Sequence, residues 1–105
     1  LDIACDSYGH TLVIPKKHCA NVLDADPEYL AACIKAVQTI SRHYVEDCGF
    51  DGVNVLNASG ECAGQSVFHL HFHVVPRKSS DGMDLWPLKD KIEVDLADVC
   101  KQLAL

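Results

Sequence analysis

The feature that most constrains the fold of this sequence is a stretch in which histidines alternate with large apolar residues. The run SVFHLHFHVVPR, from residue 66 to residue 77, contains three of the six histidines in the chain. Side chains along a β-strand point alternately to opposite faces of the sheet. The alternation therefore predicts a strand from Ser66 to Val75. One face would carry His69, His71 and His73, and the other, directed to the core, would carry Phe68, Leu70, Phe72 and Val74.

Three interpretations of the histidine face are open at this point. A half-buried strand with a polar outer face needs no histidine in particular. A zinc site is limited by distance, since the Cα atoms of His69 and His73 would lie about 13 Å apart on a strand. Zn–N bonds are only about 2.0 Å long, so at most two of the three imidazoles would reach one tetrahedral ion. Chemistry on a phosphate would use the imidazoles as nucleophile, hydrogen-bond donor and proton carrier near neutral pH.

The residues before the predicted strand favour the phosphate interpretation. Residues 58–65 read ASGECAGQ, a loop of mostly small side chains. Small residues allow backbone N–H groups to approach an anion closely. Gly64 and Ser66 then bring an amide and a hydroxyl to the start of the strand.

A long amphipathic helix is predicted between Asp26 and Gly49. Asp26 is a preferred N-cap residue, Pro27 suits the first helical position, and Glu28 lies in the positively polarised first turn. Gly49 is expected to cap the C-terminal end. Apolar residues recur at helical spacing between these ends and are expected to form one stripe: Leu30, Cys33, Ile34, Val37, Ile40, Tyr44, Val45 and Cys48.

The remaining elements are shorter. Strands are expected over residues 10–15 and 53–57, and a turn over residues 79–82. An amphipathic helix is expected over residues 90–104. Trp86 is expected either in the core or at the edge of a dimer.

Composition restricts the class of protein. The 105 residues suit one domain, and because the chain does not begin with Met we expect an upstream segment to be missing. The net charge of −6 argues against a nucleic-acid-binding surface, and no apolar run is long enough for a membrane span. The six cysteines include no C-x-x-C pair, which favours free thiols and a cytoplasmic location. His18 and His43 are expected at the surface.

The segment from His69 to Val75, HLHFHVV, resembles the histidine triad (HIT) signature of nucleotide hydrolases and transferases. The resemblance extends to GHTLVIPKKH at residues 9–18 and to AGQSVFH at residues 63–69, and it covers residues 1–77. Ser66, three residues before His69, is similar to the Hint-like branch, the nucleoside phosphoramidases. The resemblance implies an α+β fold, in which an antiparallel sheet packs with a long helix and a C-terminal helix. It also implies a homodimer with a continuous sheet.

The resemblance assigns catalytic roles to five residues. His71 would attack the α-phosphorus and form a covalent nucleotidyl-histidine, with a carbonyl, expected to be that of His69, fixing its tautomer. His73 would hold phosphate oxygens. The Ser66 hydroxyl would assist the leaving group, and His10 would help to transfer protons.

Substrate-binding roles are implied for further residues. Asp2 would accept the ribose hydroxyls and Ile3 would contact a purine, while the backbone amides of Gln65 and Ser66 would hold phosphate oxygens. Gly64, in the same loop, is also expected to contact the substrate. In the family an Asn usually stands two residues before the loop glycine, a position that Ala58 occupies here. Either Asn57 substitutes for that Asn or one phosphate contact is missing.

No cofactor or catalytic metal is expected, but three alternatives to a phosphoramidase are kept. One is a hydrolase of diadenosine polyphosphates, the other large HIT branch. Another is a nucleotide-binding regulator with weak turnover. The third is a structural zinc module, since many bacterial members hold zinc with an upstream C-x-x-C and with histidines at the positions of His18 and His69. The absence of that cysteine pair from the sequence weakens the zinc prediction.

Overall fold

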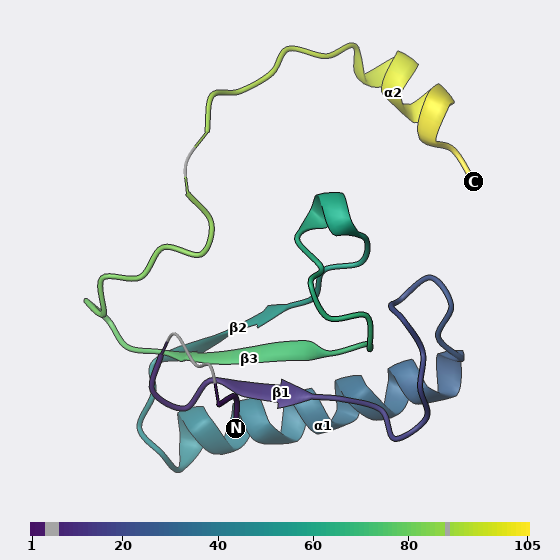
Figure 1. Cartoon of the computed structure of the whole chain (residues 1–105). Coiled ribbons are helices and arrows are strands. Elements are labelled where there is room, and N and C mark those ends of the chain that lie inside the picture. Colours follow the sequence, from purple (N-terminus) through teal and green to yellow (C-terminus); the bar gives the residue numbers. More distant parts are fainter. Residues whose placement is uncertain (4–6, 88) are drawn as a thin grey trace.

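The computed structural model describes residues 1–3, 7–87 and 89–105 and shows one antiparallel sheet packed on a long helix. Figure 1 shows α1 running beneath the sheet, in which β3 lies between β1 and β2. The arrangement confirms the expected α+β class. The elements are β1 (Thr11–Val13), α1 (Pro27–Glu46), β2 (Gly52–Leu56), the 3-10 helix η1 (Glu61–Ala63), β3 (Phe72–Arg77) and α2 (Leu96–Leu103).

The helix α1 begins as predicted, because the Asp26 carboxylate accepts a hydrogen bond from the Glu28 N–H at 3.0 Å. Its C-cap is Asp47, two residues before the glycine that was expected there. Gly49 instead adopts a φ of +74°, which glycine allows without strain, and turns the chain toward β2.

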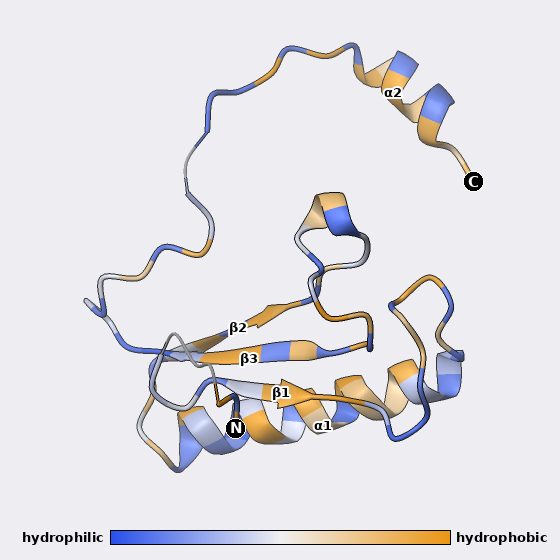
Figure 2. Cartoon of the chain, viewed as in Figure 1, coloured by the Kyte–Doolittle hydropathy of each residue, from blue (hydrophilic) through white to orange (hydrophobic). Residues whose placement is uncertain are grey.

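The core lies between α1 and the sheet. Leu70 and Val74, at 1% and 0% exposure, are its most completely buried members. Figure 2 shows the strands largely in the hydrophobic colours, whereas α1 alternates between hydrophobic and hydrophilic residues along its length. The buried cluster consists of Val13, Cys19, Cys33, Val37, Leu70, Phe72 and Val74.

The apolar stripe predicted for α1 is wider than the face that the helix buries. Cys33 and Val37 are buried, and Leu30, Ile40 and Tyr44 pack against them. Three members of the stripe, Ile34, Val45 and Cys48, are exposed. The three-stranded sheet covers only a narrow side of the helix, and Cys48 lies beyond the last helical residue, Glu46.

The predicted strand over residues 66–75 is wrong in its first half, since β3 begins only at Phe72. The neighbouring strands supply pairing partners as far as Phe72 and no further back, with Val13 opposite Phe72 and Leu56 opposite His73. The preceding segment bonds to a loop instead, as the Leu70 N–H donates to the Cys19 carbonyl at 2.8 Å. Phe68, expected in the core, is 53% exposed.

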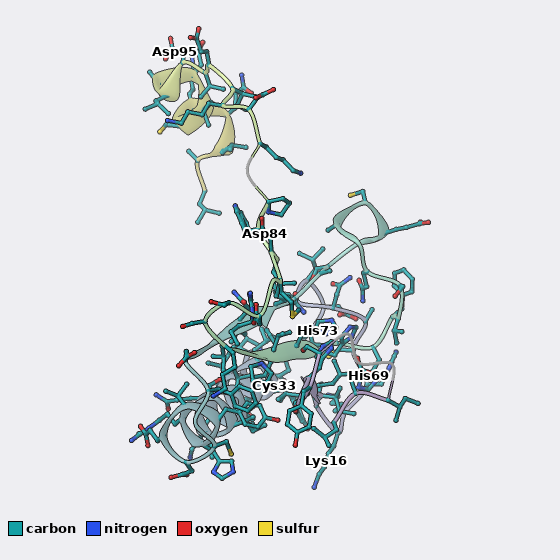
Figure 3. The ribbon with its side chains drawn as sticks, turned by 90° about the vertical axis from the view of Figure 1, so that its left-hand side faces the viewer. Lys16, Cys33, His69, His73, Asp84 and Asp95 are labelled. Atoms are coloured by element: carbon teal, nitrogen blue, oxygen red, sulfur yellow. The ribbon has the colours of Figure 1, made fainter. Side chains whose placement is uncertain are left out.

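The chain after β3 leads away from the rest of the molecule to α2 (Figure 1). Figure 3 labels Asp84 and Asp95 in this part of the chain. The helix is shorter than predicted and starts after Asp95, which caps it. Its apolar residues Leu96 and Leu103 are 71% and 75% exposed. Trp86 is also exposed, at 86%, so the prediction that it packs in the core is wrong. Within the described residues, neither helix has the length and apolar composition to cross a membrane.

The five cysteines that the structure describes are all free thiols, and Cys5 lies outside the described residues. Cys19 and Cys33 are buried in the core, and burial raises the pKa of the Cys33 thiol. Cys48, Cys62 and Cys100 are exposed.

Candidate active site

His71 lies immediately before β3, at the point where the central strand leaves the sheet. Its Nδ1 donates to the carbonyl oxygen of His69 at 2.7 Å, which is the hydrogen bond that the sequence led us to expect. A neutral imidazole that donates through Nδ1 keeps a lone pair on Nε2. The ring is half-buried, so this nitrogen is part of a group held in place by the protein yet accessible to a ligand.

Asn57 holds the backbone at the same position. Its side-chain Nδ2 donates to the His71 carbonyl at 2.9 Å, and the Ser59 hydroxyl donates to Asn57 Oδ1 at 3.0 Å. Asn57 was expected to contact the substrate. In the structure its amide group is bonded to protein, so it orients His71.

His73 connects His71 to a buried polar pair. The rings of His71 and His73 lie edge to face with centroids 4.9 Å apart, and His73 Nδ1 is 2.8 Å from Nε2 of His10. His10 is only 7% exposed, and its Nδ1 lies 3.7 Å from a carboxylate oxygen of Asp2. The Asp2 N–H donates to the His10 carbonyl at 2.8 Å and so ties the N-terminal segment to β1. The hydrogen-bonded pair of His10 and His73 suits proton transfer, and the His73 ring lies beside that of His71.

The donor atoms of Asp2, His10 and His73 lie within 4.8 Å of one another, which is close enough to surround a metal ion. Within this group, Nε2 of His10 and Nδ1 of His73 share a hydrogen bond. Nδ1 of His10 is buried without a hydrogen-bond partner in the described part of the chain, and the nearest Asp2 carboxylate oxygen is 3.7 Å away.

His69 turns its ring away from this row. Its Nε2 donates to the Pro15 carbonyl at 3.2 Å, so Nδ1 is free of a proton and accepts from Nδ1 of His18 at 3.0 Å. His69 precedes β3, which begins at Phe72, whereas His73 lies within the strand. The role expected for His69 was to supply its carbonyl to His71, and the residue makes that contact with its backbone while its ring bonds elsewhere.

The contact between His18 and His69 joins the two positions at which the resemblance implied a structural zinc site. Among the residues that the structure describes, no Cys, Asp or Glu completes a group of three donors with them. Their mutual hydrogen bond and the Pro15 carbonyl already satisfy the His69 ring. The described residues alone therefore do not complete a zinc site of that kind.

The loop before His69 is fixed by Gln65, which is 4% exposed. The backbone N–H of Gln65 donates to the Gly60 carbonyl at 3.1 Å. This backbone N–H is therefore engaged within the protein, although it was expected to contact the substrate. The Gly64 N–H is also engaged, with the Glu61 carbonyl at 2.9 Å. Ser66 is exposed at the end of this loop. The Gln65 side chain bonds to the Asn21 amide, the Gly60 N–H and the carbonyls of Ala20 and Val67.

A small apolar hollow lies beside His71. The hollow has a volume of about 210 Å³. Its apolar lining consists of Leu12 in β1, Ile14 just after β1, and Val67. His69 and His71 complete the lining. An apolar group attached to a phosphate at His71 would find a surface of matching character here.

Two positioning residues were not found from the sequence. Asn21 bonds to the buried Gln65 from the linker between β1 and α1. Tyr44, on α1, has its hydroxyl 2.6 Å from Thr11 Oγ1 and donates to the Gly9 carbonyl at 2.9 Å. Both contacts join residues far apart in the chain, so no local pattern signals them.

The linker that carries His18 is stabilised by Asp24. The backbone N–H groups of Asn21 and Ala20 donate to its carboxylate at 3.0 and 3.1 Å. These bonds lower the pKa of Asp24 below its ordinary value. The turn therefore keeps its shape when the carboxylate is charged, and the contacts of His18 with His69 depend on that turn.

A histidine with a fixed tautomer, at the start of the central strand of an antiparallel sheet, defines a domain that presents an imidazole nitrogen to a ligand. The family model of the HIT domain matches residues 1–80, and the chain belongs to the HIT family.

Relatives across this family are similar over most of the chain. An uncharacterized HIT-like protein of Methanocaldococcus jannaschii is 39% identical over 103 residues, which cover 98% of this chain and 78% of that protein. Adenosine 5'-monophosphoramidase hnt1 of Schizosaccharomyces pombe is 37% identical over 89 residues, covering 83% of this chain and 64% of that enzyme. The crystal structure of a HIT family member from Bacillus subtilis matches with a TM-score of 0.81 and 40% identity, over 99% of this chain and 77% of that one. This chain thus spans less than two thirds of the Schizosaccharomyces pombe enzyme.

Proposed function

We propose that the protein is a hydrolase of nucleoside phosphoramidates or related nucleotides that cleaves at the α-phosphate through a covalent nucleotidyl-histidine on His71. The observation that carries the proposal is the 2.7 Å hydrogen bond from His71 Nδ1 to the His69 carbonyl. It leaves Nε2 as the nucleophilic atom. The similarity to a named phosphoramidase supports the substrate class.

In the proposed reaction, His71 Nε2 attacks phosphorus and the P–N bond to the leaving amine breaks. The Ser66 hydroxyl assists the amine as it takes up a proton, and His73 donates a hydrogen bond to a phosphoryl oxygen. Water then attacks the same phosphorus, the P–N bond to His71 breaks, and a nucleoside monophosphate leaves. His10, bonded to His73, transfers protons during these steps. No metal takes part in either step.

The nucleoside end of the substrate is assigned to the N-terminal segment. Asp2, half-buried beside His10, would accept hydrogen bonds from the ribose hydroxyls. Ile3 is fully exposed and would cover one side of a purine base. We further propose that the protein acts in the cytoplasm, where its free thiols persist, and as a homodimer, which would cover the exposed apolar residues of α2.

The test compares adenosine phosphoramidate with a diadenosine polyphosphate as substrates of the intact protein. Faster turnover of the phosphoramidate is expected, together with a phosphorus–nitrogen adduct on the peptide containing His71 after a rapid acid-free quench and mass spectrometry. His71→Ala is expected to lower turnover at least about a thousandfold while AMP still binds. His43→Ala, an exposed histidine on α1, is the matched control and should leave turnover unchanged. Full activity in His71→Ala would reject the mechanism.

A further inference from the structure

A second group of reactive side chains lies at the C-terminal end of α1. His71 directly precedes Phe72, the first residue of β3. The second group lies near Arg77, the last residue of β3, because the chain that follows it returns there: the Asp51 N–H donates to the Arg77 carbonyl at 2.9 Å. The group is therefore at the opposite end of the central strand from His71. It consists of His43, Asp47 and Cys48.

Cys48 has the neighbours of a nucleophile that is served by a general base. Its Sγ lies 3.4 Å from Nε2 of His43, and the other ring nitrogen, Nδ1, lies 2.8 Å from a carboxylate oxygen of Asp47. The carboxylate accepts a hydrogen bond from Nδ1–H, and in this tautomer the lone pair of Nε2 is directed toward the thiol. A nucleophile, a base at hydrogen-bonding distance and a group that orients the base are the parts by which proteins activate cysteine.

The backbone keeps these three side chains together. The N–H groups of Asp47 and Cys48 both donate to the His43 carbonyl, at 3.0 and 3.1 Å. These bonds fix the direction in which the chain leaves the helix relative to the His43 ring. The side chains of His43 and Asp47 are 60% and 66% exposed and Cys48 is exposed, so a reagent can reach the sulfur from solvent.

The chain also contains reference thiols. Cys62 and Cys100 are exposed as Cys48 is. Among the cysteines that the structure describes, only Cys48 has an imidazole nitrogen at hydrogen-bonding distance from its sulfur. Exposure alone predicts similar reactivity for the three thiols, whereas assistance by a base predicts that Cys48 reacts first.

We infer that Cys48 is a nucleophilic modification site for low-molecular-weight disulfides, with His43 as its base and Asp47 orienting that base. Sγ attacks one sulfur of the reagent while the thiol proton passes to Nε2 of His43. The S–S bond of the reagent breaks, and a mixed disulfide forms on Cys48. The leaving thiolate recovers the proton from the imidazolium, so one disulfide is exchanged for another and no further oxidant is needed.

The test exposes the intact protein to oxidised glutathione and follows each thiol by quenched peptide mapping. Cys48 is expected to acquire glutathione on the order of tenfold faster than Cys62 and Cys100. This comparison is made within one folded protein and needs no variant. Equal rates at the three thiols would overturn the inference.

Two variants and a matched control test the roles of His43 and Asp47 in the reaction of Cys48. His43→Gln should lower the rate at Cys48 to that of Cys62, and Asp47→Asn should lower it by about threefold. Glu46→Gln removes the same charge one residue away, from a carboxylate that pairs with Arg42, and should not slow the reaction.

Loss of the Asp47 charge and loss of the orientation of the His43 ring predict opposite changes in the reaction rate of Cys48. Loss of a nearby negative charge by itself favours a thiolate, so an electrostatic effect alone would make Asp47→Asn faster. An unchanged rate in His43→Gln, or a faster one in Asp47→Asn, would therefore contradict the inference. Cys48→Ser should hydrolyse adenosine phosphoramidate as the parent protein does, so a failure here leaves the proposed function unaffected.

Discussion

Leu70→Ala tests whether the core directly beneath the histidines carries the stability of the domain. Leu70 is 1% exposed and stands between His69, whose carbonyl fixes the tautomer, and His71. The substitution removes three carbons, worth about 2.4 kcal/mol at about 0.8 kcal/mol for each buried methylene. The cavity that remains raises the expected loss to about 3 kcal/mol.

Urea unfolding followed by circular dichroism measures this loss, and a thermal scan should show a fall in Tm of about 15 °C. Val67→Ala is the matched control, because Val67 lies on the same segment but is 59% exposed. It should change the free energy of unfolding by no more than about 0.5 kcal/mol. If the two variants differ by less than about 1 kcal/mol, the assignment of Leu70 to the core is wrong.

Three shorter predictions follow from individual contacts. Asn57→Ala frees the His71 carbonyl and should lower kcat about tenfold with a smaller change in KM, as steady-state kinetics would measure. Tyr44→Phe loses a buried hydroxyl contact between α1 and the start of β1 and should cost about 1 kcal/mol in urea unfolding. The Arg77 guanidinium holds the pKa of Asp81 well below its usual range, so the stability from this pair is present above about pH 4 and lost as the pH falls further. Asp81→Asn should therefore flatten the acid limb of a stability–pH curve.

Side-chain alternation predicted the buried residues of the central segment better than it predicted the strand itself. Leu70, Phe72 and Val74 are buried as expected. The limits of β3 depend on where partners exist, and the short strands β1 and β2 pair with it only from Phe72 onward. Because pairing is a property of the assembled sheet, the sequence of the histidine segment could not supply that boundary.

The contacts of the candidate site also fall into local ones, which the sequence predicted, and long-range ones, which it did not. The hydrogen bond between His71 and the His69 carbonyl is local, spanning two residues, and was expected. The contacts of His71 with Asn57 and of His73 with His10 span 14 and 63 residues. Such contacts depend on the register of the sheet, so the sequence suggested the participants but not which atoms meet.

The spacing of the histidines has a physical reason in this structure. Leu70 and Phe72, on either side of His71, are 1% and 7% exposed and anchor the backbone to the core from both directions. A shift of one residue in the alternation would exchange the two faces and bury the imidazole. His71 can therefore keep its ring toward solvent, and its Nδ1 on the carbonyl two residues earlier, because its apolar neighbours occupy the opposite face.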